Sequence, residues 1–338
     1  MNRRVFLMGA AGIAGCSRSE PRLNVYNWSD YIGGETIADF EREFRVRIRY
    51  GTYESAPEML AKVMSGNSGW DVVFPSAEFV QPMIGMNLLQ PLRHDWLPHL
   101  NALDDQFRSP KWDPALEYTV PYMHGTTGIA YQKPLGVTAW RDLWEERMRG
   151  RITMLDDPPE VFGACLKKIG DSVNSGATGE LQNAAREAIA QKRLLRAYLN
   201  AEVRDQLIAG DVAAAQAWAV TAGQAIAAAP DRLAYAFPAE GFARYADTVA
   251  ILRESRRPEM SHRFIDFLLR PEVAAKIVEA TQTATANAGA LKLLPAGIRE
   301  NPVLYPPQEV LARGEWFEPQ TAVSQKLRDR LWTEIKSS

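Results

Sequence analysis

The segment Leu23-Asn24-Val25-Tyr26-Asn27-Trp28-Ser29-Asp30-Tyr31 decides the fold expected for this chain. Its leucine, valine and first tyrosine favour a short buried strand. Gly33-Gly34 then breaks the backbone, and Glu35–Phe44 carries apolar residues at helical spacing. The strand therefore ends in an aromatic-acidic patch, at the edge where open α/β sheets gather ligands. The alternative is a solvated Asp30 in an Asx-turn between two core aromatics.

Hydroxyl and carboxylate side chains also follow two later segments that are predicted to be strands. Asp71–Phe74 is a short apolar strand that leads to Ser76 and Glu78. Arg151–Leu155 ends in Asp156-Asp157-Pro158-Pro159-Glu160, where Asp157 and Glu160 can also serve as the N-cap and capping-box partner of the next helix. Both roles are compatible, because a cap at a cleft-facing helix start can face a ligand.

The remaining segments complete an alternating α/β pattern. We expect these elements: helices at 56–64, 79–92, 140–148, 179–199, 203–208, 221–228, 261–269, 272–280 and 322–335, and extended segments at 46–50, 119–122, 127–131, 212–218 and 248–252. Asp266 and Arg270 are spaced for an exposed i,i+4 pair. Cys165 is expected to be a buried free thiol.

Composition restricts the function. The 338 residues suit two domains, and a formal net charge of −2 argues against a nucleic-acid partner. The two cysteines give no disulfide framework, the four histidines show no metal-ligand spacing, and no nucleophile or phosphate-loop motif occurs. We therefore expect no catalytic residues, no metal and no cofactor.

The N-terminus predicts export. Arg3-Arg4 ahead of an apolar run resembles a twin-arginine signal, and Ile13-Ala14-Gly15-Cys16 resembles a bacterial lipoprotein cleavage box. Residues 1–15 are then the signal peptide, Cys16 carries the lipid, and 16–22 form a tether outside the fold. The alternative is an apolar N-terminus that happens to contain a cysteine.

Eight landmarks in order resemble the bacterial spermidine/putrescine-binding proteins of ABC transporters. They are Tyr26–Tyr31, Thr52-Tyr53-Glu54-Ser55, Asp71–Ser76, His124-Gly125-Thr126-Thr127-Gly128, Asp156–Phe162, Gly210-Asp211-Val212 before Trp218, Phe267–Pro271 and Gly314-Glu315-Trp316. The resemblance implies a two-lobed α/β periplasmic-binding fold of type II, with two open sheets, flanking helices and a ligand cleft between the lobes. Residues 23–124 with 247–297 would form lobe 1, and 125–246 with 298–338 lobe 2.

Carried over position by position, the resemblance implies a ligand-binding set in that cleft. Its members are Trp28, Ser29, Asp30, Tyr31, Ser76, Glu78, Asp157, Glu160, Trp218, Tyr245, Asp247 and Phe317. Tyr245 keeps an aromatic where the family usually has Trp or Phe. Glu78 replaces an aromatic of the spermidine binder and adds negative charge, whereas Phe317 replaces a polar contact and adds apolar surface.

The expected function is an exported, lipid-anchored, monomeric receptor that delivers a polyamine such as spermidine or putrescine to an ABC permease. Carboxylates would bind the ammonium groups and aromatic faces the methylenes, with Asp157 and Glu160 at one end of the ligand. The alternatives are another cationic or zwitterionic solute, an exported amine-acting enzyme, and a lipoprotein that binds a protein partner.

Overall fold

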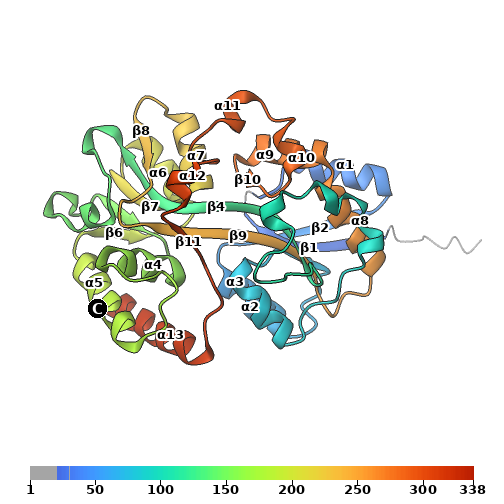
Figure 1. Cartoon of the computed structure of the whole chain (residues 1–338), viewed down its shortest axis with the longest axis horizontal. Coiled ribbons are helices and arrows are strands. Elements are labelled where there is room, and N and C mark those ends of the chain that lie inside the picture. The colour runs from blue at the N-terminus through green and yellow to red at the C-terminus, as the bar shows by residue number, and fades with distance from the viewer. Residues whose placement is uncertain (1–20, 30) are drawn as a thin grey trace, which may run out of the picture.

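The computed structural model describes residues 21–29 and 31–338. The strands are β1 Arg22–Trp28, β2 Arg47–Tyr53, β3 Val72–Val73, β4 Thr119–Gln132, β5 Ile152–Met154, β6 Leu195–Tyr198, β7 Ala214–Trp218, β8 Leu233–Ala236, β9 Phe242–Ile251, β10 Ala284–Thr285 and β11 Gly314–Trp316. Two long strands, β4 and β9, run across the molecule between its two halves (Figure 1).

Two open sheets share β4. The first has the order β2-β1-β3-β9-β4, with β1, β2 and β3 parallel and β9 antiparallel to β3 and β4. The second continues β4-β7-β5-β6, with β5, β6 and β7 parallel. Short strands β10, β8 and β11 are added to β4 and β9. The predicted pair of open sheets is confirmed, and β4 joins them as one continuous strand.

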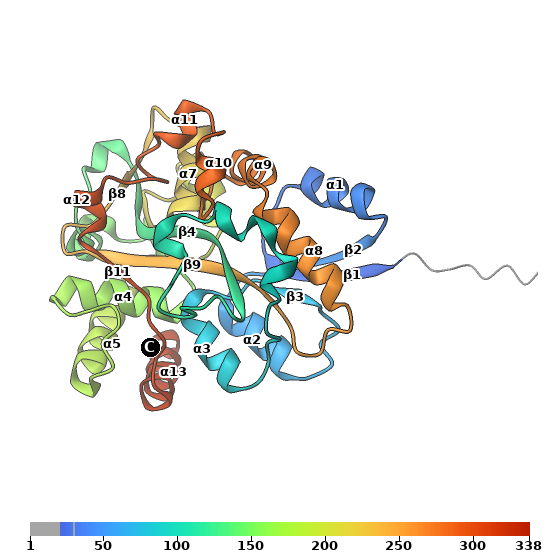
Figure 2. The same ribbon diagram turned by 45° about the vertical axis from the view of Figure 1, so that its right-hand side comes forward.

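Helices cover both sheets in the two views of the molecule (Figures 1 and 2). They are α1 Gly34–Phe44, α2 Ala56–Met64, α3 Ala77–Gly85, α4 Pro158–Ile169, α5 Thr178–Lys192, α6 Val203–Ala209, α7 Ala219–Ala228, α8 Pro258–Leu269, α9 Pro271–Thr281, α10 Ala288–Leu291, α11 Ala296–Arg299, α12 Gln308–Leu311 and α13 Ala322–Ser337. Separate apolar cores lie under each half: one contains Phe40, Phe74 and Phe264, another Trp140, Phe162 and Leu181. Cys165 is a buried free thiol, as predicted.

Two helix predictions are wrong in extent. The helix expected at 79–92 ends at Gly85, because Asn87 takes a left-handed φ of 57° and Leu89 pairs with Leu252 at the sheet. The helix expected at 179–199 ends at Lys192, since the following residues add β6 to the parallel edge of β5. Packing against the sheet overrides local helix propensity there.

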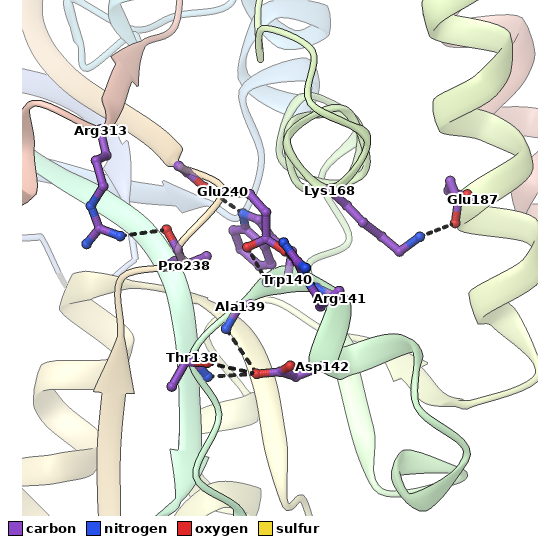
Figure 3. Close-up of polar contacts among 11 residues, drawn as sticks. Thr138, Ala139, Trp140, Arg141, Asp142, Lys168, Glu187, Pro238, Glu240 and Arg313 are labelled. Carbon is purple, nitrogen blue, oxygen red and sulfur yellow. Dashed lines mark hydrogen bonds and ion pairs between the residues drawn. The ribbon is translucent and has the colours of Figure 1, made fainter.

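The segment 140–148 forms two 3-10 turns instead of an α-helix: Trp140–Trp144 and Glu146–Met148. Side-chain carboxylates hold its N-terminal backbone (Figure 3). Glu240 accepts the N–H groups of Trp140 and Arg141, while Asp142 accepts those of Thr138 and Ala139. These bonds fix a short turn that buries the Trp140 ring.

Two smaller predictions also need correction. Asp266 and Arg270 do not pair with each other, because Asp266 accepts hydrogen bonds from His99 and Arg270 forms a two-pronged pair with Glu43. The expected tether 16–22 overlaps the fold, since β1 begins at Arg22 and the carbonyl of Pro21 accepts the N–H of Arg47 at 2.8 Å. The signal peptide and Cys16 lie outside the described residues.

Candidate functional site

Four strands, a parallel pair from each sheet, deliver side chains to one place. Trp28 ends β1, Ser76 follows β3, Asp157 follows β5 and Trp218 ends β7, and all four line a single cavity. The carboxyl ends of the parallel strands in both sheets therefore meet at the space between the two halves. This arrangement is the one that the sequence pattern predicted.

Two helices begin at the same cavity, one from each half, and both views place α3 and α4 on the same side of the crossing strands (Figures 1 and 2). Ser76 and Asp157 are their N-cap residues, with Glu78 and Glu160 in the first turns. The side chain of Asp157 accepts the N–H of Glu160 at 3.3 Å, as an N-cap should. The positive ends of both helix dipoles favour these carboxylates.

The cavity encloses about 730 Å³ of space, part of it open to solvent. Its lining consists of Trp28, Ser29, Tyr31, Glu54, Ala56, Ser76, Glu78, Asp157, Pro159, Glu160, Ala201, Trp218, Val220, Thr221, Gln224, Tyr245, Asp247 and Phe317. Five of these described residues are acidic, and none is Lys, Arg or His. The site is therefore strongly electronegative and has no cation of its own to compensate the charge.

Asp247 lies on the crossing strand β9 and is only 3% exposed. Its Oδ1 accepts the hydroxyl of Ser76 at 2.7 Å, and its Oδ2 accepts the hydroxyl of Tyr31 at 3.0 Å. Burial raises the pKa of Asp247 to about 6, and the two hydroxyl donors oppose that rise. The carboxylate is thus held in one orientation at an energetic cost.

Glu160 faces the cavity from α4 and is 4% exposed. One oxygen, Oε1, accepts both the Thr127 hydroxyl and the Trp218 indole N–H at 2.8 Å. The other oxygen, Oε2, is buried without a hydrogen-bond partner among the described residues. Burial, together with the charge of Asp157, raises the pKa of Glu160 well above its ordinary value. The unpartnered oxygen is a vacant acceptor.

The buried carboxylate of Asp157 and the half-buried one of Glu78 have raised pKa values as well. Burial raises the pKa of Asp157 to about 6 and that of Glu78 to about 8. Glu78 Oε2 is also buried without a partner among the described residues. Charges on Asp247 and Asp157 add to the Glu78 shift, which means that the carboxylates of the two halves affect one another across the cavity.

Aromatic side chains form the walls. The indole of Trp28 is anchored by its N–H on the carbonyl of Phe74 at 3.0 Å, and its ring centroid lies 6.3 Å from that of Tyr31. Trp218, Tyr245 and Phe317 pack together with Val173 in one cluster. Gly125 on β4 makes room for Tyr245, because a Cβ there would come within 2.4 Å of the tyrosine hydroxyl oxygen.

Eleven of the twelve side chains proposed from sequence line this cavity, and the twelfth, Asp30, lies outside the described residues. Their role as ligand contacts stays a prediction. Sequence reasoning missed Glu54, which follows β2 and could have been found by the same strand-end rule. It also missed one face of α7 with Val220, Thr221 and Gln224, in which Gln224 lies four residues after Val220 and three after Thr221, a helical spacing visible in the sequence.

The chain matches the family described as bacterial extracellular solute-binding protein over residues 35–304. It belongs to that family. The putrescine-binding periplasmic protein PotF of Escherichia coli is 31% identical, with 97% of this chain and 95% of that protein covered. A solved structure described as a spermidine/putrescine ABC transporter from Listeria monocytogenes has a TM-score of 0.90 and 29% identity, covering 93% and 98% of the two chains. The TpPotD lipoprotein of Treponema pallidum has a TM-score of 0.81 and 26% identity, covering 93% and 99%.

Two side chains of this solute-binding protein reach across the cleft. Asn200, from the loop after β6, donates to the carbonyl of Glu54 at 3.3 Å, and Gln224 of α7 donates to the carbonyl of Thr281 at 2.8 Å. The structure therefore has its two halves in contact around the site.

Within residues 21–29 and 31–338, no helix is both long and apolar enough to cross a bilayer, and no group of three or more His, Cys, Asp or Glu could hold a metal ion.

Proposed function

We propose that this chain is an extracytoplasmic receptor that binds a linear polyamine and delivers it to an ABC importer. The observation that carries the proposal is a cleft with three buried carboxylates (Asp157, Glu160 and Asp247), a half-buried Glu78 and no basic side chain among its described lining residues. A carboxylate oxygen shielded from water needs a cationic or hydrogen-bonding partner, and Glu160 and Glu78 each keep one such oxygen unpartnered among the described residues. The names of the relatives, which are putrescine and spermidine binders, support the same ligand class.

The ligand would lie along the cleft with its nitrogens on the carboxylates. Asp157 and Glu160 bind one terminal ammonium group, and Asp247 binds a nitrogen toward the other end. Charge-assisted hydrogen bonds of this kind are shorter and stronger than neutral ones. The methylenes lie against Trp28, Trp218 and the other aromatic walls, where a cation over a ring face contributes roughly 0.5–2 kcal/mol.

A zwitterionic solute fits the cleft less well than a polyamine. The carboxylate of an amino acid needs a basic partner or several donors. The side-chain donors at the cavity are largely committed: Ser76 and Tyr31 to Asp247, and the indole groups to Phe74 and Glu160. An added carboxylate would also be repelled by the five acids already present.

Ligand binding would favour closure of the two lobes, for which we propose the boundaries 23–124 with 247–297 and 125–246 with 298–338. Without a cation the carboxylates of the two halves repel each other and retain water, which keeps the halves apart. A bound polycation neutralises both sides, and the Asn200 and Gln224 contacts then hold the halves together.

We further propose that the protein is exported through its twin-arginine-like N-terminus, anchored by a lipid on Cys16 in the periplasm or cell envelope, and monomeric. A relative described as a lipoprotein supports the anchor. Metabolic labelling with a radioactive fatty acid tests it. Wild-type protein should incorporate label and Cys16→Ser should not.

Native mass spectrometry tests the ligand class. Protein purified without denaturation should carry a bound molecule whose mass matches a polyamine. In a thermal-shift panel of diamines, triamines and amino acids, only the polyamines should raise the melting temperature of the protein. Stabilisation by amino acids instead of polyamines would contradict the proposal. Failure of every small molecule to raise the melting temperature would favour a protein partner.

A further inference from the structure

Glu78 differs from the other carboxylates of the cleft in how it is held. Asp247 accepts two hydroxyl donors, and Glu160 accepts a hydroxyl and an indole N–H. Glu78 has only its own backbone N–H as a donor and no side-chain donor among the described residues, and its Oε2 is buried and unpartnered. A buried carboxylate oxygen without a donor destabilises the ionised form. Glu78 is therefore built to receive a donor that the empty protein does not supply.

The surroundings of Glu78 contain no protein cation. Its own backbone N–H lowers the pKa of Glu78, and the carboxylates of Asp247 on β9 and of Asp157 at the start of α4 raise it. The charge of Glu78 in turn raises the pKa of Glu160. The nearby Tyr245 hydroxyl stays neutral, since burial raises its pKa well above its ordinary value. The missing partner of Glu78 must therefore come with the ligand.

The number of buried acids indicates how many charges the ligand carries. Asp157 with Glu160 accounts for one ammonium group and Asp247 for a second, as proposed above. Glu78 remains, in the first turn of α3, whereas Asp157 and Glu160 lie at the start of α4 and Asp247 lies on β9. A dication leaves Glu78 without a partner, whereas a trication can place its remaining nitrogen there.

We infer that Glu78 makes the cleft selective for a linear amine with three protonated nitrogens over one with two. This inference rests on the proposed polyamine function and adds its specificity. With a diamine bound, Glu78 keeps its proton and contributes little to the binding free energy. With a triamine bound, Glu78 gives its proton to water and accepts a charge-assisted hydrogen bond from the ligand nitrogen.

The release of that proton gives the inference a signature. Glu78 is protonated in the empty protein at pH 7, because burial raises its pKa to about 8. Triamine binding to the wild type should therefore release about one proton more per molecule than diamine binding does. Titration calorimetry in two buffers of different ionisation enthalpy measures that difference directly.

The test compares the wild type with Glu78→Gln, which resembles the protonated acid in shape and charge. Calorimetry at pH 7 with a linear triamine and a linear diamine should show the triamine affinity of the variant falling about tenfold or more, since charged hydrogen bonds exceed neutral ones by that order. The diamine affinity should stay within about threefold, and the extra proton release should disappear. Glu35→Gln, which removes an exposed charge on α1, is the matched control and should change neither affinity.

The outcomes separate this inference from the function on which it depends. Wild-type protein that binds neither amine would overturn the polyamine function itself. Wild-type protein that binds both, with a variant that loses affinity for the two amines equally or for neither, would overturn only the role of Glu78. A melting temperature of the variant close to that of the wild type shows that folding is not the cause.

Discussion

Replacing Asp247 by asparagine should make the empty protein more stable at neutral pH while it weakens ligand binding. Asp247 is 3% exposed, and burial raises its pKa to about 6 from an ordinary value of 3.8. A shift of this size, at 1.36 kcal/mol per unit, corresponds to a cost of about 3 kcal/mol for the ionised form.

The sign of the pH dependence follows from that shift. Below about pH 4 the carboxyl is protonated in both the folded and the unfolded chain, and its ionisation costs nothing. As pH rises to about 6 the unfolded chain releases its proton first, so stability falls, and above pH 6 the full cost is present. The Asp247→Asn variant has no ionisable group at this position, so its stability does not fall through this pH range for that reason.

Part of the gain is offset by hydrogen bonding. Tyr31 and Ser76 both donate to Asp247, and an asparagine oxygen can keep one of these bonds while its amide must donate to the other hydroxyl. This rearrangement costs about 1 kcal/mol. The variant should therefore be about 2 kcal/mol more stable than the wild type at pH 7.5 and no more stable than the wild type at pH 4.

Urea unfolding of ligand-free protein at the two pH values measures the difference. Calorimetry at pH 7.5 should show polyamine affinity reduced by about a hundredfold or more, because a ligand ammonium group loses a buried charged partner. A variant that is less stable than the wild type by the same amount at both pH values would refute the electrostatic reasoning, as would unchanged affinity.

Asp113→Asn serves as the control. Asp113 is equally buried but lies outside the cleft, and it accepts the backbone N–H groups of Glu117, Tyr118 and Thr119. Its replacement should lower stability by about 1–3 kcal/mol, since backbone donors lose acceptors. Ligand affinity of the folded fraction should not change.

Three further substitutions test the walls and the closed state. Trp218→Phe keeps a ring but removes the indole N–H that Glu160 accepts at 2.8 Å. Calorimetry should show a loss of about tenfold in polyamine affinity, and an unchanged affinity would exclude a role of Trp218 in positioning Glu160. Gly125→Ala should displace the Tyr245 ring and weaken ligand binding, because the new Cβ would lie 2.4 Å from the tyrosine hydroxyl oxygen. The control Gly34→Ala places its Cβ where no atom lies within 4 Å and should bind the ligand normally. Equal affinities of the two variants would be inconsistent with this account of Tyr245. Gln224→Ala removes the hydrogen bond to the Thr281 carbonyl across the cleft. Stopped-flow fluorescence should show the ligand dissociating about 2–10 times faster, with little change in the association rate. A slower association rate alone would contradict a role of Gln224 in holding the cleft closed.

The sequence predicts much of the site because strand ends are local features. Trp28, Asp157 and Trp218 each lie at the carboxyl end of a strand segment, and the two sheets face their carboxyl ends toward the same cavity. Asp247 has a different origin, since it lies inside the antiparallel strand β9. No periodicity distinguishes it from a surface residue, and only the family resemblance pointed to it.

The parts that sequence missed depend on contacts between distant segments. The helix expected through residue 199 ends early because β6 joins a sheet edge that local propensity cannot reveal. The interruption expected at 123–126 is absent, since Gly125 on the continuous strand β4 only clears space for Tyr245 from β9. Likewise, the face of α7 that turns toward the cavity is set by its contacts with α6 and β4.

The most direct test is a paired calorimetric titration of the ligand-free protein at pH 7 with a linear polyamine and with an ω-amino acid of equal length. The two ligands share one ammonium end and the methylene chain, and differ in charge at the other end. The account predicts saturable binding of the polyamine and no measurable heat from the amino acid, because the cleft holds carboxylates and no described basic side chain. Equal or tighter binding of the amino acid would contradict the claim that this cleft is built for a polycation.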